Sequence, residues 1–315
     1  MNYDKIPVNK NASPEARQLL EYLVDTAGNA IITGQHTQTN PMEEYHYIHE
    51  LTGHFPKLVG FELLSYSPNI NYDDASEECL TEVYENRDTL DTAMKIAEST
   101  DSILTFCFHW FSPIGGRDKA FYSRHTDFDA SKVLIDGSPE RDAFFSDLRH
   151  IAELLIPFKE KNIPILWRPF HEVEGDWFWW GKKGGEVAKE LYLLMYHLFV
   201  DEYHLDNLLW VWSSPTKESY PGDEFVDVIG WDIYLPEKEY TDYADKYKKL
   251  VADTTTSKVC ALTEIGYMPD MDKLKESRIP WAYFMTWSKE FCFDGDYNTT
   301  EDTKNVYKND YSIKL

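Results

Sequence analysis

The chain has 315 residues, of which 43% are hydrophobic. This is enough for a large core, and α/β barrels often reach this length as one domain. Its 55 acidic and 31 basic residues give a net charge of -24, which repels the phosphates of nucleic acids and anionic membranes but sets no limit on a neutral ligand. The sequence has no run of eighteen apolar residues, so no membrane-spanning helix is expected. Its first residues lack the apolar region of a signal peptide.

Eight short apolar or β-branched runs, separated by helical patterns, are predicted strands. Continuous apolar runs are typical of strands that are buried on both faces, as in a parallel sheet covered by helices. In chain order the runs lie at residues 30–36, 57–66, 102–110, 163–172, 207–214, 226–234, 258–267 and 282–288.

Helix signals separate several of these runs. The first helix begins with Ser13 as N-cap and Pro14 at the first helical position, and Gly28 can end it. The Ser-Pro-Glu opening recurs at 138–140, and apolar residues recur at three- and four-residue spacing in 186–204. Eight strands alternating with helices predict a (β/α)8 barrel, with residues 1–315 as one domain. A doubly wound open sheet is the alternative, but no glycine-rich phosphate loop follows the first strand.

A barrel of this kind carries its active site at the C-terminal ends of its strands. Two glutamates hold such positions, Glu172 after the fourth strand and Glu264 after the seventh. Strands four and seven lie on opposite sides of a barrel, so these carboxyl groups can face each other. Retaining glycoside cleavage needs two carboxyl groups roughly 5–5.5 Å apart. The full set of predicted strand-end residues is His36, Glu62, His109, Trp110, His171, Glu172, Asp232, Tyr234, Glu264 and Trp287.

The neighbours of the two glutamates suit this chemistry. Arg168 lies four residues before Glu172, so strand alternation gives both the same facing, and Arg168 could hold a carboxylate ionised. A core salt bridge is the alternative role for Arg168. Tyr234 could donate its phenol to Glu264, or could simply bond to the backbone. His171 could bind a sugar hydroxyl or merely cap its loop.

All ten tryptophans fall in predicted strands or the adjacent loops. Strand alternation places Trp167, Trp210 and Trp212 in the core. The others near strand ends are predicted at the rim, where flat apolar rings stack on pyranose rings, although an aromatic cluster beneath a loop would give the same pattern. These rim residues are Trp110, Trp177, Trp179, Trp180 and Trp287.

The four cysteines give little information about function. Cys107 and Cys260 lie in apolar strand-like runs and are predicted to be buried free thiols. Cys79 and Cys292 could pair only if the fold brings them together.

The stretch WRPFHEVEGDWFWWG, residues 167–181, closely resembles the fourth-strand signature of glycoside hydrolase family 26, in which Arg-Pro-Phe/Leu-His-Glu precedes Gly-x-Trp-Phe-Trp-Trp-Gly. ALTEIGY resembles the family's seventh strand and FVDVIGWDIY its sixth, while FHW and TWS fit the third and eighth. The resemblance covers roughly residues 13–290. It departs at Glu174, where the family often has Asn or Asp, and at Asp176, where it often has Gly; we expect both residues to shape the loop.

The resemblance implies a retaining hydrolase on a (β/α)8 barrel, in most cases an endo-acting β-1,4-mannanase, with Glu172 as acid/base and Glu264 as nucleophile. It also implies that His109, His171, Trp177 and Tyr234 bind sugar or position carboxylates, and that Arg168 matches the arginine below the acid/base. We assign Trp110 and Trp287 to substrate binding as well. The remaining expectations are no metal or organic cofactor, a β-mannan substrate, a monomer, and a secreted, cell-surface or periplasmic location.

Three alternatives remain open. Family 26 also includes β-1,3-xylanases and mixed-linkage β-glucanases, and no motif excludes them. A carbohydrate-binding barrel without catalysis is disfavoured because both glutamates are present. A metal-dependent barrel hydrolase could use His36, His109, His171 and Asp232, but these histidines occur singly and no His-x-His lies on the first strand.

Overall fold

The computed structural model describes residues 3–38, 42–293 and 295–315. Each of the eight predicted strands is present and pairs in parallel with the next along the chain. The first strand also pairs with the eighth, through Ile32 and Tyr283, so the sheet closes into a barrel and the fold prediction is confirmed. The strands are β1 (Ile31–Thr37), β2 (Leu58–Glu62), β3 (Ile103–Cys107), β4 (Ile165–Arg168), β5 (Leu208–Ser213), β6 (Val228–Ile233), β7 (Val259–Ile265) and β8 (Trp281–Thr286).

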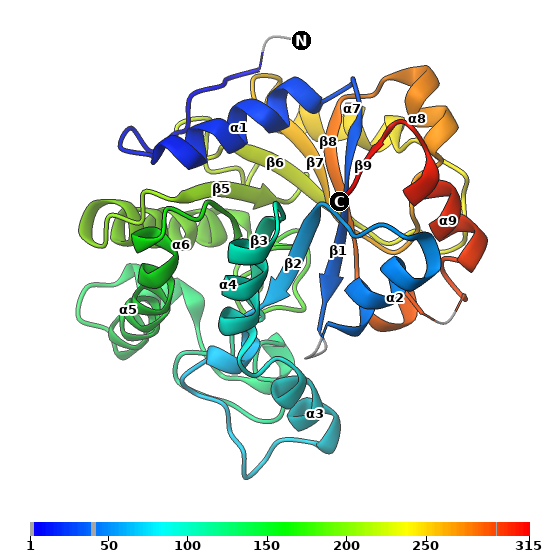
Figure 1. Cartoon of the computed structure of the whole chain (residues 1–315). Helices are drawn as coiled ribbons and strands as arrows, with labels where there is room; N and C mark the ends of the chain where they lie inside the picture. The colour runs from blue at the N-terminus through cyan, green and yellow to red at the C-terminus, as the bar shows by residue number, and fades with distance from the viewer. Residues whose placement is uncertain (1–2, 39–41, 294) are drawn as a thin grey trace.

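Helices surround the barrel in Figure 1. The regular alternation is broken between β5 and β6, where the described residues 214–227 form turns rather than a helix. The helices are α1 (Pro14–Thr26), α2 (Glu43–Thr52), α3 (Glu77–Glu85), α4 (Thr89–Ser99), α5 (Pro139–Glu160), α6 (Gly185–His197), α7 (Ala244–Asp253), α8 (Met271–Ser277) and α9 (Thr300–Lys308).

The predicted helix starts are present. Ser13 Oγ accepts the N–H of Ala16, and Ser138 Oγ accepts the N–H of Arg141, both at 3.1 Å. Each cap satisfies a backbone donor that the helix leaves unpaired and stabilises it by about 1 kcal/mol. At its other end α1 stops at Thr26, two residues before Gly28.

One end of the barrel is closed by α1. Leu20 and Leu23 of this helix belong to the same apolar cluster as barrel residues such as Ile32, Leu166 and Val228. This cluster fills the interior of the barrel at the end from which the chain enters β1.

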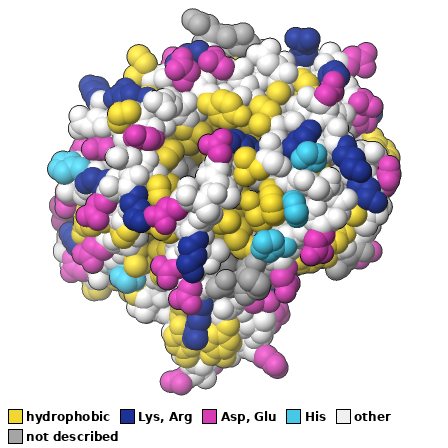
Figure 2. All heavy atoms as spheres, in the orientation of Figure 1, with side chains coloured by type: hydrophobic (Ala, Val, Ile, Leu, Met, Phe, Trp, Pro, Cys, Tyr) yellow, Lys and Arg dark blue, Asp and Glu magenta, His cyan; other side chains and the backbone are white. Residues whose placement is uncertain are grey.

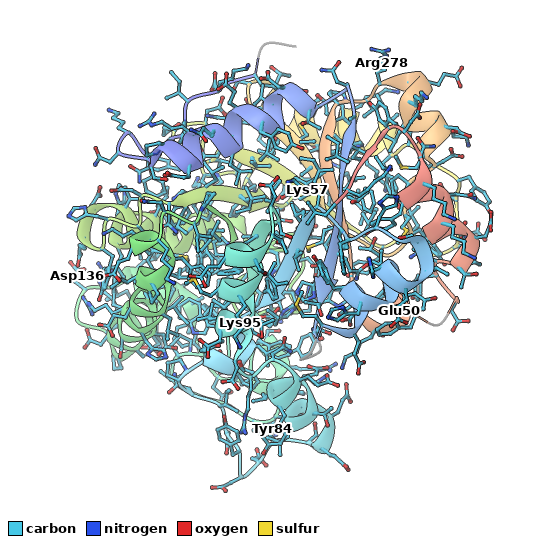
Figure 3. All side chains as sticks on the ribbon, viewed as in Figure 1. Glu50, Lys57, Tyr84, Lys95, Asp136 and Arg278 are labelled. Atoms are coloured by element: carbon cyan, nitrogen blue, oxygen red, sulfur yellow. The ribbon has the colours of Figure 1, made fainter. Side chains whose placement is uncertain are left out.

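Two elements lie outside the predicted alternation of eight strands with helices. The short strand β9 (Ser312–Ile313) pairs in parallel with β1 on the outside of the barrel. Helix α3 belongs to the long connection after β2 and lies beyond the arrowheads of β1 and β2 in Figure 1. Its Tyr84 points away from the barrel in Figure 3 and is 48% exposed.

The surface in Figure 2 carries acidic and basic side chains mixed together, with no single charged patch on this face. No helix in the described parts of the chain has both the length and the apolar character needed to cross a bilayer.

Candidate active site

Arg168, the last residue of β4, links two carboxylates at the barrel mouth. Its Nη1 donates to Asp232 Oδ2 at 2.8 Å, and its Nη2 donates to Glu264 Oε2 at 2.7 Å. All three side chains are almost fully buried. Arginine suits this position because its rigid planar fork can serve two carboxylates at once.

A bulge in β7 sets the direction of Glu264. Gly230 pairs with Ala261 and Asp232 pairs with Glu264, so β7 has one residue more than β6 between these two pairs. Such a bulge redirects the side chains beyond it. Gly230 leaves the necessary space, because a Cβ there would lie 2.2 Å from the Thr263 side chain.

The second oxygen of Asp232, Oδ1, accepts two further hydrogen bonds. Ser213 and Thr263 both donate their hydroxyl groups to Oδ1, at 2.7 and 2.8 Å. With Arg168 on the other oxygen, Asp232 is fixed in one orientation, and it can in turn fix the guanidinium beneath Glu264.

Tyr234 supplies the second donor to Glu264. Its hydroxyl lies 2.5 Å from Glu264 Oε1, the oxygen that Arg168 leaves free, as predicted from the sequence. The Tyr234 side chain is 40% exposed, so it lies at the open mouth while Glu264 lies below it.

Glu172 reaches the mouth by a different route from the one predicted. Strand β4 ends at Arg168, and Phe170 (φ 43°) and Glu172 (φ 55°) both have left-handed backbone conformations. Strand alternation therefore does not relate Arg168 to Glu172. The bond from Arg168 to Glu264 agrees with the role predicted for Arg168, which was to hold a carboxylate ionised. The Glu172 N–H donates to the Ser213 carbonyl at 3.2 Å, which holds this strained segment against β5.

The loop after β4 folds an indole back onto Glu172. Trp177 Nε1 donates to Glu172 Oε2 at 2.8 Å, while 44% of the Trp177 side chain stays exposed. Gly175 makes this possible, because a Cβ there would lie 2.1 Å from the Trp177 ring. Glu174 and Asp176 are exposed on the same loop, and Asp176 pairs with Lys182.

Burial and charge give the two glutamates different acidities. Burial, followed by the negative charges of Glu264 and Asp232, raises the pKa of Glu172 well above its ordinary value. Burial also raises the pKa of Glu264, but Arg168 and the Tyr234 hydroxyl oppose this and hold it to about 7. The first proton taken up by the pair therefore goes to Glu172, and Glu264 is the carboxylate.

His109, His171 and Trp287 lie together beside the carboxylates. His171 Nε2 lies 3.2 Å from His109 Nε2, and the centroids of the His109 and Trp287 rings are 5.9 Å apart. The half-buried Trp287 stacks on His36, with ring centroids 3.9 Å apart. A cavity of about 280 Å³ opens beside His109 and Trp287, between the loops that follow β1, β2, β3 and β8.

Three tryptophans predicted at the rim are in the core. Trp110 is 1% exposed, packs on Phe144 of α5 and donates its Nε1 to Asp147, so its assignment to substrate binding is wrong. Trp179 and Trp180 are equally buried and donate their indole N–H groups to backbone carbonyls. The loops after β3 and β4 pack against each other and enclose these rings, which strand alternation cannot foresee.

The described residues contain one group with donor atoms close enough for a metal ion. The donor atoms of His36, Glu62 and Cys107 lie within 4.8 Å of one another, and all three residues are buried. The Cys107 thiol donates to Glu62 and also contacts His36, so these atoms already bond to one another. Cys79 and Cys292 are free thiols, as are Cys107 and Cys260.

Residues 8–315 match the sequence profile of glycosyl hydrolase family 26. The chain belongs to glycosyl hydrolase family 26. The resemblance seen in the sequence is therefore confirmed, and the buried arginine, the two glutamates and the tyrosine described above form the C-terminal mouth of a family 26 barrel.

The chain is also similar to individual mannanases. A mannan endo-1,4-beta-mannosidase of Thermothelomyces thermophilus is 32% identical over 98% of the chain. The crystal structure of a Podospora anserina GH26-CBM35 beta-(1,4)-mannanase is 30% identical, with a TM-score of 0.87 over 99% of this chain and 68% of that one. A beta-mannanase from a symbiotic protist of the termite Reticulitermes speratus, complexed with gluco-manno-oligosaccharide, is 29% identical, with a TM-score of 0.86 over 99% and 97%. The chain spans 62%, 48% and 51% of the length of three curated relatives that it matches.

Several residues of this family 26 site were absent from the predicted set. Glu62 had been placed at a strand end without a role, and Asp232 only as a possible metal ligand, although Asp232 stands two residues before Tyr234 and so shares its facing. Ser213, Thr263 and Gly175 gave no signal in the sequence, since their roles depend on the register of neighbouring strands and on one folded-back ring.

Proposed function

We propose that this chain is an endo-acting retaining glycoside hydrolase that cleaves β-1,4-mannosidic bonds. One observation carries the proposal: Glu264 is held by two donors, Arg168 and Tyr234, while Glu172 has the higher pKa and bonds the exposed Trp177. These are the different environments that a nucleophile and a general acid require.

In the first step the Glu264 carboxylate attacks the anomeric carbon. The bond from this carbon to the leaving oxygen breaks, and Glu172 transfers its proton to that oxygen. The product is a glycosyl ester of Glu264. Arg168 and Tyr234 keep Glu264 ionised and oriented before the attack.

In the second step Glu172, now a carboxylate, takes a proton from water. The water oxygen bonds to the anomeric carbon and the ester bond to Glu264 breaks, which restores both glutamates. Two displacements return the β configuration. The carboxyl carbons of Glu172 and Glu264 should therefore lie roughly 5–5.5 Å apart, as retaining enzymes require.

The aromatic residues at the mouth suit sugar rings on both sides of the cleaved bond. Trp177 beside the general acid would contact the leaving group, and Trp287 beside β7 would contact the sugar that Glu264 attacks. His109 and His171 would bind hydroxyl groups of that sugar. The cavity beside His109 and Trp287 gives room for further units of a polysaccharide.

The substrate assignment draws on relatives named mannan endo-1,4-beta-mannosidase and on the beta-mannanase complexed with gluco-manno-oligosaccharide. Mannan, glucomannan and galactomannan are accordingly the proposed substrates. We further propose that the protein acts as a monomer at a secreted, cell-surface or periplasmic location, where such polysaccharides occur.

Product analysis tests the proposal. The purified chain is incubated with mannan, galactomannan, glucomannan, β-1,3-xylan and mixed-linkage glucan, with and without a chelator. We expect internal cleavage of the mannans only, no effect of the chelator, and a first product with β configuration by NMR. Cleavage of xylan or glucan alone would overturn the substrate, an α product would overturn retention, and binding without cleavage would indicate a non-catalytic barrel.

A further inference from the structure

We propose that Glu62 is a positioning residue: its carboxylate keeps His109 doubly protonated, and His109 in turn fixes the tautomer of His171 beside the general acid. This inference goes deeper into the proposed active site, and its activity readout therefore depends on the proposed function. Its spectroscopic readout does not.

Glu62, the last residue of β2, is completely buried and is in contact with three hydrogen-bond donors and one histidine ring nitrogen. Its Oε1 accepts the backbone N–H groups of Leu64 at 2.9 Å and His109 at 2.7 Å. Its Oε2 lies 2.7 Å from His109 Nδ1 and 3.0 Å from the Cys107 thiol, which donates to it. Two backbone N–H groups and a thiol donate to this carboxyl, so these contacts favour its ionised form, and the ionised form favours a hydrogen on His109 Nδ1.

The charge of Glu62 determines that of His109. Burial would lower the pKa of His109, but the charge and hydrogen bond of Glu62 outweigh burial and raise it. In return the His109 charge and hydrogen bond outweigh burial at Glu62 and lower the Glu62 pKa to about 2. The other charged or titratable groups with the largest effects on His109, or most affected by it, lie at the barrel mouth: Arg168, Glu264, Asp232, His171 and His36.

His109 then leaves only one arrangement for His171. The two Nε2 atoms are 3.2 Å apart, so only one of them can carry a proton toward the other. His109 uses Nδ1–H for Glu62 and Nε2–H for His171, and His171 must accept at Nε2. Burial and the His109 charge lower the pKa of His171 far below its ordinary value, so His171 is neutral with its proton on Nδ1.

This arrangement has two consequences for the reaction. Among the described residues Nδ1 of His171 has no partner, so it is a buried donor that a sugar hydroxyl can satisfy. The His109 charge also lowers the pKa of Glu264, after the larger effects of burial, Arg168, Asp232 and Tyr234. A negative charge at β2, outside the reacting pair, thereby helps to keep the nucleophile ionised.

Histidine NMR tests the proton positions in the wild-type protein, and variants serve only to assign the signals. The chain is labelled with 15N-histidine, and two-bond correlations are recorded from pH 5 to 9, with assignments from His109→Gln and His171→Gln. We expect His109 to remain doubly protonated well above pH 6.5, the ordinary value for histidine, and His171 to be a neutral Nδ1–H tautomer throughout. A His109 that titrates at its ordinary pH, or a His171 protonated at Nε2, would overturn the proposal.

Glu62→Gln tests the cause, with Asp147→Asn as the matched control. Both substitutions convert a buried carboxyl to an amide, but Asp147 bonds Trp110 in the core rather than a histidine. In Glu62→Gln, His109 should be neutral at pH 7, and the acidic limb of kcat/KM on mannan should move up by about one pH unit, the lower end of the effect of a nearby opposite charge. Asp147→Asn should change neither.

The possible results separate the two proposals. An unchanged His109 signal in folded Glu62→Gln contradicts the positioning role. If the His109 charge disappears but the pH profile does not move, the link from Glu62 to Glu264 is wrong. If the wild-type protein has the expected proton positions but cleaves no mannan, the proposed function fails and the role of Glu62 in the histidine network stands.

Discussion

Tyr234 donates its hydroxyl to Glu264 Oε1 at 2.5 Å, while Arg168 donates to Oε2 of the same carboxylate. The two donors come from different strand ends, β6 and β4, and together they occupy both oxygens. Glu264 therefore cannot rotate without losing one of them. The same hydrogen bond lowers the pKa of Glu264 against the effect of burial.

Tyr234→Phe should separate this hydrogen bond from the arginine contact. A hydrogen bond to a charged group contributes about 1.5–3 kcal/mol, so kcat on mannan should fall roughly 10- to 100-fold. Without the donor the pKa of Glu264 rises, and the acidic limb of kcat/KM should move to higher pH. Initial rates from pH 4 to 9 measure both effects. Tyr240→Phe, at a tyrosine that is 64% exposed, is the control, and an equal loss there would refute the specific role of Tyr234.

Gly175→Ala and Trp177→Phe should weaken the general acid in two ways. An alanine Cβ would lie 2.1 Å from the Trp177 ring and push the indole off Glu172, whereas phenylalanine keeps a ring and removes only the N–H. A neutral hydrogen bond contributes about 0.5–1.5 kcal/mol, so each variant should lose up to roughly 10-fold in kcat/KM on mannan. An aryl mannoside, whose leaving group needs little protonation, should lose less with Trp177→Phe. Equal losses on both substrates would place Trp177 in sugar binding alone.

Azide should distinguish the two glutamates by the stereochemistry of the product. Glu172→Ala still forms the glycosyl ester from an aryl glycoside but lacks a base for water, so azide should attack the ester and give a β-azide. Glu264→Ala forms no ester, and azide should enter from the opposite face and give an α-azide. NMR of the isolated azides identifies each product. The reverse pair of products would exchange the two roles, and full activity of both variants on mannan would misplace the site.

The raised pKa of Glu172 also predicts how stability depends on pH. The folded protein holds this proton more tightly than the unfolded chain, so the resulting stability is complete below the ordinary pKa of about 4.5 and is lost as pH rises toward the folded pKa. Glu172→Gln accepts the Trp177 N–H without this loss. Its Tm should exceed that of the wild type by at least about 2 °C at pH 8, and the gain should disappear near pH 4.

Thermal unfolding followed by circular dichroism measures this difference. The exposed Asp176 on the same loop provides the control, since Asp176→Asn should change stability by less than about 0.5 kcal/mol. A Glu172→Gln gain that is the same at pH 4 and pH 8 would mean that ionisation is not its cause.

The barrel could be predicted because each of its strands and helix starts is recognisable within one short segment of the sequence. Each strand is a continuous apolar run, and Ser13 with Pro14 caps a helix whatever lies elsewhere in the chain. Glu172, Glu264, Arg168 and Tyr234 could also be found, because motif and strand end coincide at these positions. The bonds from Arg168 and Tyr234 to Glu264 are both present, whereas the shared facing predicted for Arg168 and Glu172 is not.

Other features depend on relations between segments that are distant in the sequence. Trp110 was placed at the rim because it follows a strand, but the loop after β4 covers it and α5 offers Asp147 as its acceptor. The alternation argument failed at Glu172 because two left-handed residues follow β4. The charge pair of Glu62 and His109 joins two strand ends, which no single motif contains.

The bulge in β7 also limits how this chain can change in length. Between the pairs Leu262–Phe284 and Ile265–Thr286, β7 again has one residue more than β8, so the extra residue is out of step with both neighbours. Just before this point β8 has one residue more than β7, between the pairs Cys260–Trp281 and Leu262–Phe284, so the two irregularities compensate each other. Deleting one residue from β7 would remove this compensation and rotate Glu264 toward the surrounding helices. The connections around the mouth can gain or lose residues without this effect. We therefore expect insertions and deletions among homologues to occur in the loops around the mouth and to spare the three residues 262–264.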